Sequence, residues 1–381
     1  MSNAETSDQT LESALDAVVS RTGETLDRVG DSFPYFADPS TGEWTTTPNG
    51  NWCGGHWIGL LRLAADQTND DRFARTAEKQ TEKMVEYMPR ESMFCGMNFH
   101  YAGFRTYDLT GDRSAFGLGL SGADAMVEYY NDRARHIPLG LLDIEGPEQF
   151  RGPDEDHGPR GDRIGAVDDV YTALLVLWRA YEETGDTRFR DTAVSHADRH
   201  LDWFIKEDGS TWHHVVFDAE SGELERQYNE LALSDESCWA RGQGWNIAGL
   251  CRAYGETSAP RYLTALERTV DYYRTHSPDD LVPYWDFEAP PASDTPRDTS
   301  AAVLTAYGLT RLPAEDQTLE LRTFGRRILD RLLDGYFVTD PDHPCYGGLL
   351  DGCFNAPGNY ATDNELVWSD YYLAHMLSTL V

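Results

Sequence analysis

A recurring helix–turn–helix unit is the feature of this sequence that most restricts its fold. Each unit has an apolar helical segment, a short turn and a second, amphipathic helical segment. Glycine after the first segment predicts a left-handed end residue, and Asp or Thr in the turn predicts a cap for the second segment. A sixth apolar segment starts at Tyr371, and we expect its partner at 11–29, near the other end of the chain. The five complete units have their apolar segments at 59–65, 103–110, 173–178, 247–254 and 301–312.

Six hairpins whose first and last helices pair predict an all-α fold, the (α/α)6 barrel of six helical hairpins. Apolar helices then form an inner ring and amphipathic helices an outer ring. We expect residues 1–381 to form this single catalytic domain. Such repeats can also stack into an open solenoid, but the unequal intervals between units favour a closed barrel with long loops on one rim. The loops, where a site is expected, are at 49–57, 93–99, 146–169, 210–218, 284–300 and 346–370.

The charge of the chain excludes one class of partner. There are 65 acidic and 32 basic residues, for a net charge of -33, and the acidic residues are spread along the chain. Nucleic acid is therefore not an expected partner, because phosphate binding needs a basic face. A surface of this kind fits solubility in concentrated salt, as in a halophile, because salt screens the self-repulsion.

The distribution of apolar residues and cysteines points to the cytoplasm. The first ten residues are polar and acidic, and no run of 18 apolar residues occurs, so neither a signal peptide nor a membrane span is expected. The six cysteines are scattered without a CxxC pair, which argues against a disulfide framework and a zinc knuckle.

The segment Ser237-Cys-Trp-Ala-Arg-Gly-Gln-Gly-Trp245 is the strongest candidate for a site, and it leads directly into an amphipathic helix. Trp239 and Trp245 offer indole faces on which a sugar ring can stack, and Arg241 offers a guanidinium that can pair with a carboxylate. The alternative is a core helix anchored by tryptophan and capped by the arginine.

An acidic pair lies at the mouth of the apolar helix at 173–178. Burial of Asp168 or Asp169 at such a place raises a carboxyl pKa toward the range of a general acid. The two residues lie about 100° apart on a helix, so only one faces the centre easily. The alternative role is N-capping of the helix.

Further candidates are one tryptophan and three histidines. Trp52 lies beside glycines that allow close approach of a ligand, whereas Trp57 fits a core position better. His100 is expected at a helix entrance, where a structural role is the more common one. His213 and His214 are expected in a short hairpin, facing opposite sides of a strand. A metal site would need further ligands at suitable spacing, and the sequence shows none.

The remaining motifs argue against a cofactor. The acidic loop at 154–162 lacks the EF-hand pattern and fits a solvated loop better than a calcium site. Arg297 and Asp298 are expected to brace a loop and cap a helix. There is no GxSxG, P-loop or dinucleotide fingerprint.

Together these segments resemble glycoside hydrolase family 88, the unsaturated glucuronyl hydrolases, a family of six-hairpin glycosidases. The resemblance runs from about residue 33 to 380 and includes Asp168 ten residues before Trp178. The segments that carry it are Trp52-Cys-Gly-Gly-His-Trp-Ile-Gly-Leu-Leu, Ser210-Thr-Trp-His213, Ser237-Cys-Trp-Ala-Arg-Gly-Gln-Gly-Trp245, Pro283-Tyr-Trp-Asp-Phe287, Arg297-Asp-Thr-Ser-Ala-Ala302 and Val367-Trp-Ser-Asp-Tyr-Tyr372.

The resemblance implies a cofactor-free (α/α)6 barrel that removes a 4,5-unsaturated uronic acid from the non-reducing end of lyase-generated oligosaccharides. In the family an aspartic acid protonates C4 of the vinyl ether, water adds at C5, and the resulting hemiketal opens and releases the aglycone. Asp168 falls on the position of that acid. The positions that line the family's site correspond to Trp52, His100, His213, Trp239, Arg241 and Trp245.

One departure bears on the reaction. Where the family has a second aspartate after the histidine, this chain has Tyr101, whose phenol is a poor base at neutral pH. The family's tryptophan upstream of the acid is replaced by the loop at 146–162. Alternatives to the family's reaction are therefore a related six-hairpin glycosidase acting on another sugar and a non-catalytic sugar-binding barrel. We expect an oligosaccharide as partner and a monomer or homodimer.

Overall fold

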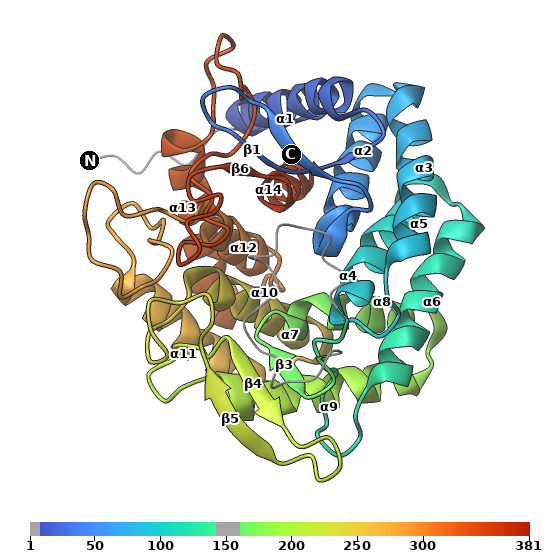
Figure 1. Ribbon diagram of the computed structural model, residues 1–381, viewed down its shortest axis with the longest axis vertical. Coiled ribbons are helices and arrows are strands. Elements are labelled where there is room, and N and C mark those ends of the chain that lie inside the picture. Colours follow the sequence, from blue (N-terminus) through green and yellow to red (C-terminus); the bar gives the residue numbers. More distant parts are fainter. Residues whose placement is uncertain (1–7, 142–160) are drawn as a thin grey trace.

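Two concentric rings of helices form the body of the computed structural model, which describes residues 8–141 and 161–381 (Figure 1). The inner ring consists of α2 (Gly54–Thr68), α4 (Met93–Phe99) with its continuation, α7 (Asp169–Thr172) with α8 (Leu174–Thr184), α10 (Ala240–Thr257), α12 (Thr299–Thr310) and α14 (Val367–Leu380). The outer ring consists of α1 (Asp8–Val29), α3 (Asp71–Tyr87), α6 (Arg113–Tyr129), α9 (Thr187–Phe204), α11 (Pro260–His276) and α13 (Leu319–Gly335).

Contacts between the inner helices close the ring. Helix α14 packs against both α12 and α2, and it also packs against α1, so the last inner helix pairs with the first outer helix. The sixth hairpin is therefore made from the two ends of the chain. The predicted (α/α)6 barrel is confirmed.

An ion pair between the two ends of the chain reinforces this closure. The guanidinium of Arg21 on α1 donates from Nε and Nη2 to the two oxygens of Glu365, at 2.8 and 2.6 Å, and both side chains are buried. Glu365 lies in β6 (Glu365–Leu366), directly before α14, and β6 pairs with β1 (Phe33–Ala37). Strand β1 pairs in turn with β2 (Trp44–Thr47).

The turns inside the hairpins follow the predicted chemistry. Gly111 and Gly185 both adopt a φ of 70° directly after an inner helix, a conformation that favours glycine. The next residue, Asp112 or Asp186, accepts a hydrogen bond from the first turn of the following outer helix, at 2.8 and 3.0 Å. These turns are short, so the inner and outer helices of each hairpin are antiparallel neighbours.

The connections from the outer helices to the next inner helices lie on one rim, as predicted, and all but the short one between α3 and α4 are long. Two of them together form an antiparallel sheet, with β3 (Ile164–Ala166) from the connection before α7 and with β4 (His214–Phe217) and β5 (Leu224–Tyr228) from the connection before α10. The hairpin expected near His213 and His214 is the β4–β5 pair.

The loop predicted at 93–99 is wrong, because these residues are helix α4. The helix continues through a π-helical turn, His100–Arg105, into α5 (Thr106–Thr110). Gly96 explains the error. A Cβ at this position would lie 2.7 Å from the carbonyl oxygens of Thr172 and Ala173, so the glycine allows two inner helices to approach and does not mark a loop.

The expectations for 142–160, an acidic solvated loop in place of the family's tryptophan, lie outside the described residues. Within the described residues, no helix has both the length and the apolar character needed to cross a membrane.

Candidate active site

Asp168 lies on the rim that carries the long connections, at the N-terminal end of α7. Its backbone carbonyl accepts hydrogen bonds from the N–H groups of Tyr171 and Thr172, at 3.0 and 2.9 Å, but its side chain makes no capping hydrogen bond. The capping role considered from the sequence is therefore wrong. Oδ1 is buried and has no hydrogen-bond partner among the described residues, and the side chain is 9% exposed.

The surroundings of Asp168 favour its protonated form. Burial raises the pKa of this carboxyl to about 7, the guanidinium of Arg241 opposes the shift, and the neighbouring carboxylate of Asp169 adds to it. A carboxyl group with a pKa near neutrality can donate a proton and take one back at the same pH, which is what a general acid and base requires.

Asp169 points away from Asp168, into two histidines. Its carboxylate lies 2.6 Å from Nε2 of His136 and 2.9 Å from Nε2 of His196, and it accepts the N–H of Ala166 at 3.1 Å. Although burial alone would raise the pKa of Asp169, the two histidines hold it well below the usual value. Asp169 is therefore engaged in fixing the segment before α7. As expected from the angle between the two residues, it does not face the same way as Asp168.

Two groups of side chains in the described part of the chain bring metal-ligand atoms together. They are His136, Asp169 and His196, and His213, His214 and Glu230. In the first group Nδ1 of His196 accepts the N–H of Ile137 at 2.9 Å, which places the proton on Nε2, the atom that would have to bind a metal. Hydrogen bonds thus already account for the arrangement of the first group without a metal ion. No local spacing in the sequence indicates the first group, because its members lie on separate elements.

Arg241 is a fixed cation near Asp168. Its guanidinium lies over the rings of Trp239, Phe354 and Trp368, at 4.5, 5.5 and 5.8 Å. It donates to the carbonyl oxygens of Cys353 and Phe354, the latter at 2.8 Å. The side chain is 2% exposed, so its position is set by the protein.

Asp298 completes the setting of this arginine. It lies 3.4 Å from Nη1 of Arg241, and it accepts the N–H of Ser300 at 3.0 Å at the start of α12. The predicted capping role of Asp298 is confirmed. The predicted bracing role of Arg297 is also confirmed, because this arginine pairs with Asp280 at 2.7 Å.

Trp239 and His213 lie next to each other, with ring centroids 4.5 Å apart. The backbone N–H of Val167 donates to the carbonyl of His213 at 2.8 Å, so the segment that carries Asp168 is bonded to the segment that carries His213. The prediction that His213 and His214 face opposite ways is wrong, since their rings stack at 3.7 Å. Strand β4 begins only at His214, so strand alternation does not apply to this pair.

The two other predicted tryptophans differ in position. Trp52 is 9% exposed, donates from Nε1 to the hydroxyl of Tyr35 at 2.9 Å, and lies 4.8 Å from Trp368. It therefore joins the aromatic group around Arg241. Trp245 is 1% exposed and packs against Tyr171 and Tyr372 in the core.

His100 and Tyr101 are not at a helix entrance, because the helix begins at Met93. The hydroxyl of Tyr101 lies 2.9 Å from that of Tyr372 and 3.3 Å from that of Tyr171, and burial raises the pKa of Tyr101 well above the usual value. His100 lines a cavity whose lining does not include Asp168. Two other residues of this helix contact Trp52: the ring of Phe94, with centroids 5.6 Å apart, and Asn98, which donates to the Trp52 carbonyl at 2.8 Å.

Site residues that the sequence reasoning did not single out are Phe354, Trp368 and Tyr35. Each is an aromatic residue in or beside a long connection, and only the folded chain brings them to Arg241 and Trp52. The signal that could have found Trp368 is its place at the start of an inner helix, like that of Trp239.

Comparisons with known proteins identify the family of this chain. Residues 25–311 match the model of Glycosyl Hydrolase Family 88. Unsaturated glucuronyl hydrolase from Bacillus sp. (strain GL1) is 29% identical over 372 residues, which cover 94% of this chain and 93% of that protein. Unsaturated chondroitin disaccharide hydrolase from Streptococcus pneumoniae is 27% identical over 377 residues, covering 96% and 90%.

A solved structure is similar over almost the whole chain. The crystal structure of unsaturated glucuronyl hydrolase from Bacillus sp. GL1 superposes with a TM-score of 0.84 at 25% identity, covering 97% of this chain and 96% of that chain. Because the family model matches most of this chain, the chain is a glycoside hydrolase and belongs to Glycosyl Hydrolase Family 88.

Proposed function

We propose that this enzyme removes a 4,5-unsaturated uronic acid from the non-reducing end of oligosaccharides by hydrating the vinyl ether of that sugar. The observation that carries the proposal is Asp168, a buried carboxyl with a pKa of about 7 and with one oxygen that has no hydrogen-bond partner in the described part of the chain. The names of the two relatives, a glucuronyl hydrolase and a chondroitin disaccharide hydrolase, support the substrate class.

Asp168 supplies the proton in this reaction and recovers it. The protonated carboxyl donates to C4, which leaves positive charge on C5 and the ring oxygen. The resulting carboxylate takes a proton from water as the water oxygen bonds to C5, and a hemiketal forms. The bond between C5 and the ring oxygen then breaks to give a ketone at C5, and the hemiacetal at C1 expels the aglycone as an alcohol.

The neighbouring side chains suit the charge and shape of such a sugar. Hydrogen bonds to Cys353, Phe354 and Asp298 account for three of the five N–H groups of Arg241, which leaves two for the uronic acid carboxylate. The indole of Trp239, stacked on the guanidinium, and the ring of His213 form one wall. Trp52 extends the aromatic wall through its contact with Trp368.

A single carboxyl group serves as both acid and base in this proposal. Asp169 is held by His136 and His196, and the phenol of Tyr101 is buried against Tyr372 with a raised pKa. Neither is placed to activate water. The near-neutral pKa of Asp168 is what makes both steps accessible to one group.

The test follows the ultraviolet absorbance of the C4=C5 double bond, with an unsaturated uronyl disaccharide as substrate in molar KCl. We expect the absorbance to decay with the wild-type enzyme. Asp168→Asn, which keeps the shape but cannot donate the proton, is expected to lower kcat by about 10²–10⁴-fold. The matched control is Asp71→Asn, which removes the same charge from a side chain that is 87% exposed, and which should leave kcat unchanged.

The outcomes separate the possible functions. Substantial turnover by Asp168→Asn, with a native circular dichroism spectrum, would exclude Asp168 as the acid. Binding of the disaccharide by the wild-type protein without any decay would identify a sugar-binding barrel.

We also propose, from the sequence, that the functional unit is one catalytic domain that acts in the cytoplasm as a monomer or homodimer. The acidic composition and the absence of a membrane-spanning helix in the described residues support this proposal. Light scattering coupled to size-exclusion chromatography in molar KCl distinguishes the two oligomeric states.

A further inference from the structure

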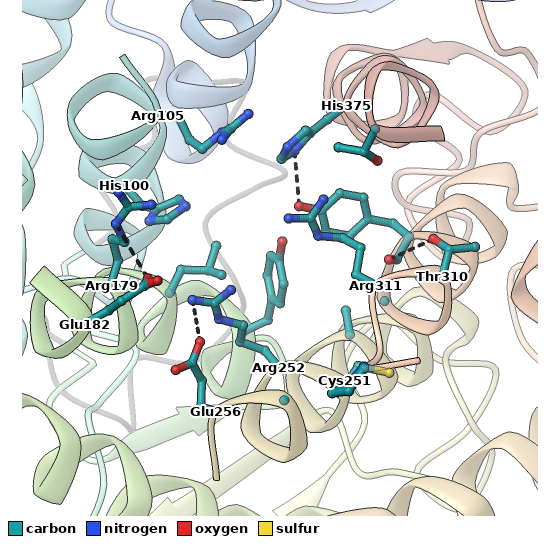
Figure 2. Close-up of a pocket in the computed structure, with 18 of the residues that line it drawn as sticks. His100, Arg105, Arg179, Glu182, Cys251, Arg252, Glu256, Thr310, Arg311 and His375 are labelled. Atoms are coloured by element: carbon teal, nitrogen blue, oxygen red, sulfur yellow. Dashed lines mark hydrogen bonds and ion pairs between the residues drawn. The ribbon is translucent and has the colours of Figure 1, made fainter. Parts of the chain in front are cut away.

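A cavity separate from the candidate active site lies among the C-terminal halves of the inner helices, at the end of the barrel opposite Asp168. It has a volume of about 570 Å³ and is lined from five of the six inner helical segments (Figure 2). None of Asp168, Trp239 and Arg241 lines it, so it is separate from the candidate active site. Between the two lies a layer of buried tyrosines, among them Tyr101 and Tyr171, whose hydroxyl groups are 3.3 Å apart.

Five arginines line this cavity, in a protein whose net charge is -33. They are Arg105, Arg179, Arg252, Arg311 and Arg322, against the three carboxylates of Asp108, Glu182 and Glu256. Figure 2 shows four of the arginines, Arg105, Arg179, Arg252 and Arg311, around one open space. A concentration of positive charge at this place is the reverse of what the composition leads one to expect.

The arginines are unequally paired. Arg105 and Arg179 share Asp108, at 3.0 and 2.7 Å, and Arg179 also pairs with Glu183 at 2.5 Å. Arg252 pairs with Glu256 at 2.6 Å. Arg311 has no ion pair within the described residues, and its guanidinium lies over the ring of Tyr307 at 5.1 Å. Even when Glu183 is counted with the three lining carboxylates, five arginines face four carboxylates, so the cavity keeps an excess of positive charge.

Two buried histidine nitrogens at the cavity lack partners. Nδ1 of His100 and Nε2 of His375 make no hydrogen bond within the described residues, and the two side chains are 8% and 3% exposed. Nδ1 of His375 lies 3.1 Å from the hydroxyl of Tyr307. If Tyr307 donates to it, Nε2 carries a proton and is a donor. A buried polar atom without a partner is costly, and a ligand in the cavity would remove that cost.

The electrostatics of the histidines show that the positive charge converges on them. Burial, and then Arg252, Arg105, Arg179 and Arg311, hold the pKa of His100 well below the usual value. Burial, followed by Arg105, Arg311 and His100, does the same for His375. Both rings are therefore neutral at pH 7, and each can donate one hydrogen bond without adding charge.

We propose that this cavity binds a small anion that carries a phosphate or sulfate group. Guanidinium groups pair with such oxyanions through two parallel hydrogen bonds, and arginines from several helices suit a tetrahedral group whose oxygens point in different directions. The volume is within the range of sites for small organic molecules, so a sugar phosphate or sugar sulfate fits as well as the free ion. Arginines here also offset the partial negative charge of the helix C-termini, but that role needs neither a cavity nor two buried histidine nitrogens that lack a partner among the described residues.

The test is isothermal titration calorimetry of the full-length protein at constant ionic strength, set with KCl. The probes are inorganic phosphate, inorganic sulfate and glucose 6-phosphate, with glucose as the neutral control. We expect at least one oxyanion to bind with a Kd of about 1 mM or tighter, and glucose not to bind. Tighter binding of glucose 6-phosphate than of inorganic phosphate would identify an ester as the ligand, and equal binding would identify the free anion.

Two variants place the binding in this cavity. Arg311→Gln and Arg252→Gln are each expected to weaken it at least about tenfold. The matched control is Arg75→Gln, which removes the same charge from a side chain that is 67% exposed on an outer helix, and which should bind like the wild type. Equal binding by Arg311→Gln and Arg75→Gln, or no binding of any oxyanion to the wild type, would overturn the proposal. The test does not depend on turnover, so its failure leaves the proposed function untouched.

Discussion

At the scale of the residue, the property that makes Asp168 suitable for catalysis should also destabilise the fold. Its pKa is about 7 in the folded protein and about 3.9 in an unfolded chain. A raised carboxyl pKa gives stability that is fully present below the unfolded value and is lost as the pH rises through the folded value. Above neutrality the enzyme therefore holds a buried carboxylate that would be more stable in water.

Asp168→Asn removes this dependence, because the amide stays neutral at all pH values. We expect the free energy of unfolding of the variant, relative to the wild type, to increase by on the order of 3 kcal/mol between about pH 5 and about pH 8. Urea unfolding at both pH values measures the difference, and Asp71→Asn is again the exposed control. If the difference in the free energy of unfolding between variant and wild type is the same at both pH values, the pKa of Asp168 is not raised in the folded protein.

The residues that could be predicted from the sequence are those with a local signal. Asp168 and Trp239 each stand at the mouth of an apolar segment, so periodicity alone places them at the end of an inner helix. His136 and His196 have no such signal. They meet Asp169 only because a connection and an outer helix converge behind α7, and no local spacing records this contact.

At the scale of the element, the hairpins could be predicted because each turn carries a glycine or a capping residue that marks it in the sequence. Helix α4 could not be predicted. Its glycine and its two phenylalanines are typical of a loop, but Gly96 allows close packing between helices. The misplaced start of the helix also moved His100 and Tyr101 to the rim, although they lie two turns inside. Gly96 and Gly117 thus allow a direct comparison of a helical glycine in a close helix contact with one that contacts no neighbouring element.

Gly96→Ala should destabilise the protein by about 1–3 kcal/mol, because the added methyl group meets two backbone carbonyls at 2.7 Å. Gly117→Ala, in the outer helix α6, meets no atom within 4 Å and should stabilise the protein by up to about 1 kcal/mol through helix propensity. Chemical unfolding of both variants gives the two values. Equal effects of the two substitutions would show that the contact of α4 with α7 is looser than the geometry indicates.

At the scale of the whole molecule, ring closure was predictable from the apolar segment at one end of the chain and the amphipathic one at the other. The arginine-lined cavity at the opposite end of the barrel from Asp168 could not be predicted from the sequence. Arg105, Arg179 and Arg252, each taken alone, look like helix-surface residues paired with a nearby acid, as Arg252 is with Glu256. Only the convergence of five helix ends turns these residues into one positively charged space.

The net charge of -33 acts on the molecule as a whole. Six carboxylic side chains are buried among the described residues, so most of the 65 acidic groups face water and repel one another. The buried ones are Asp168, Asp169, Asp286, Asp298, Glu365 and Asp370. Salt shortens the range of this repulsion from about 30 Å at 0.01 M to about 3 Å at 1 M. We therefore expect Tm at neutral pH to rise steadily as KCl increases over this range.

The same KCl series near pH 4.5, the isoelectric point of the sequence, is the control. The net charge is close to zero there, so screening has little repulsion to remove and the rise in Tm should be much smaller. Differential scanning calorimetry gives both series. A rise of equal size at the two pH values would mean that KCl acts through the hydration of apolar surface, as salts excluded from the protein surface do, and that the acidic surface is not what couples stability to salt.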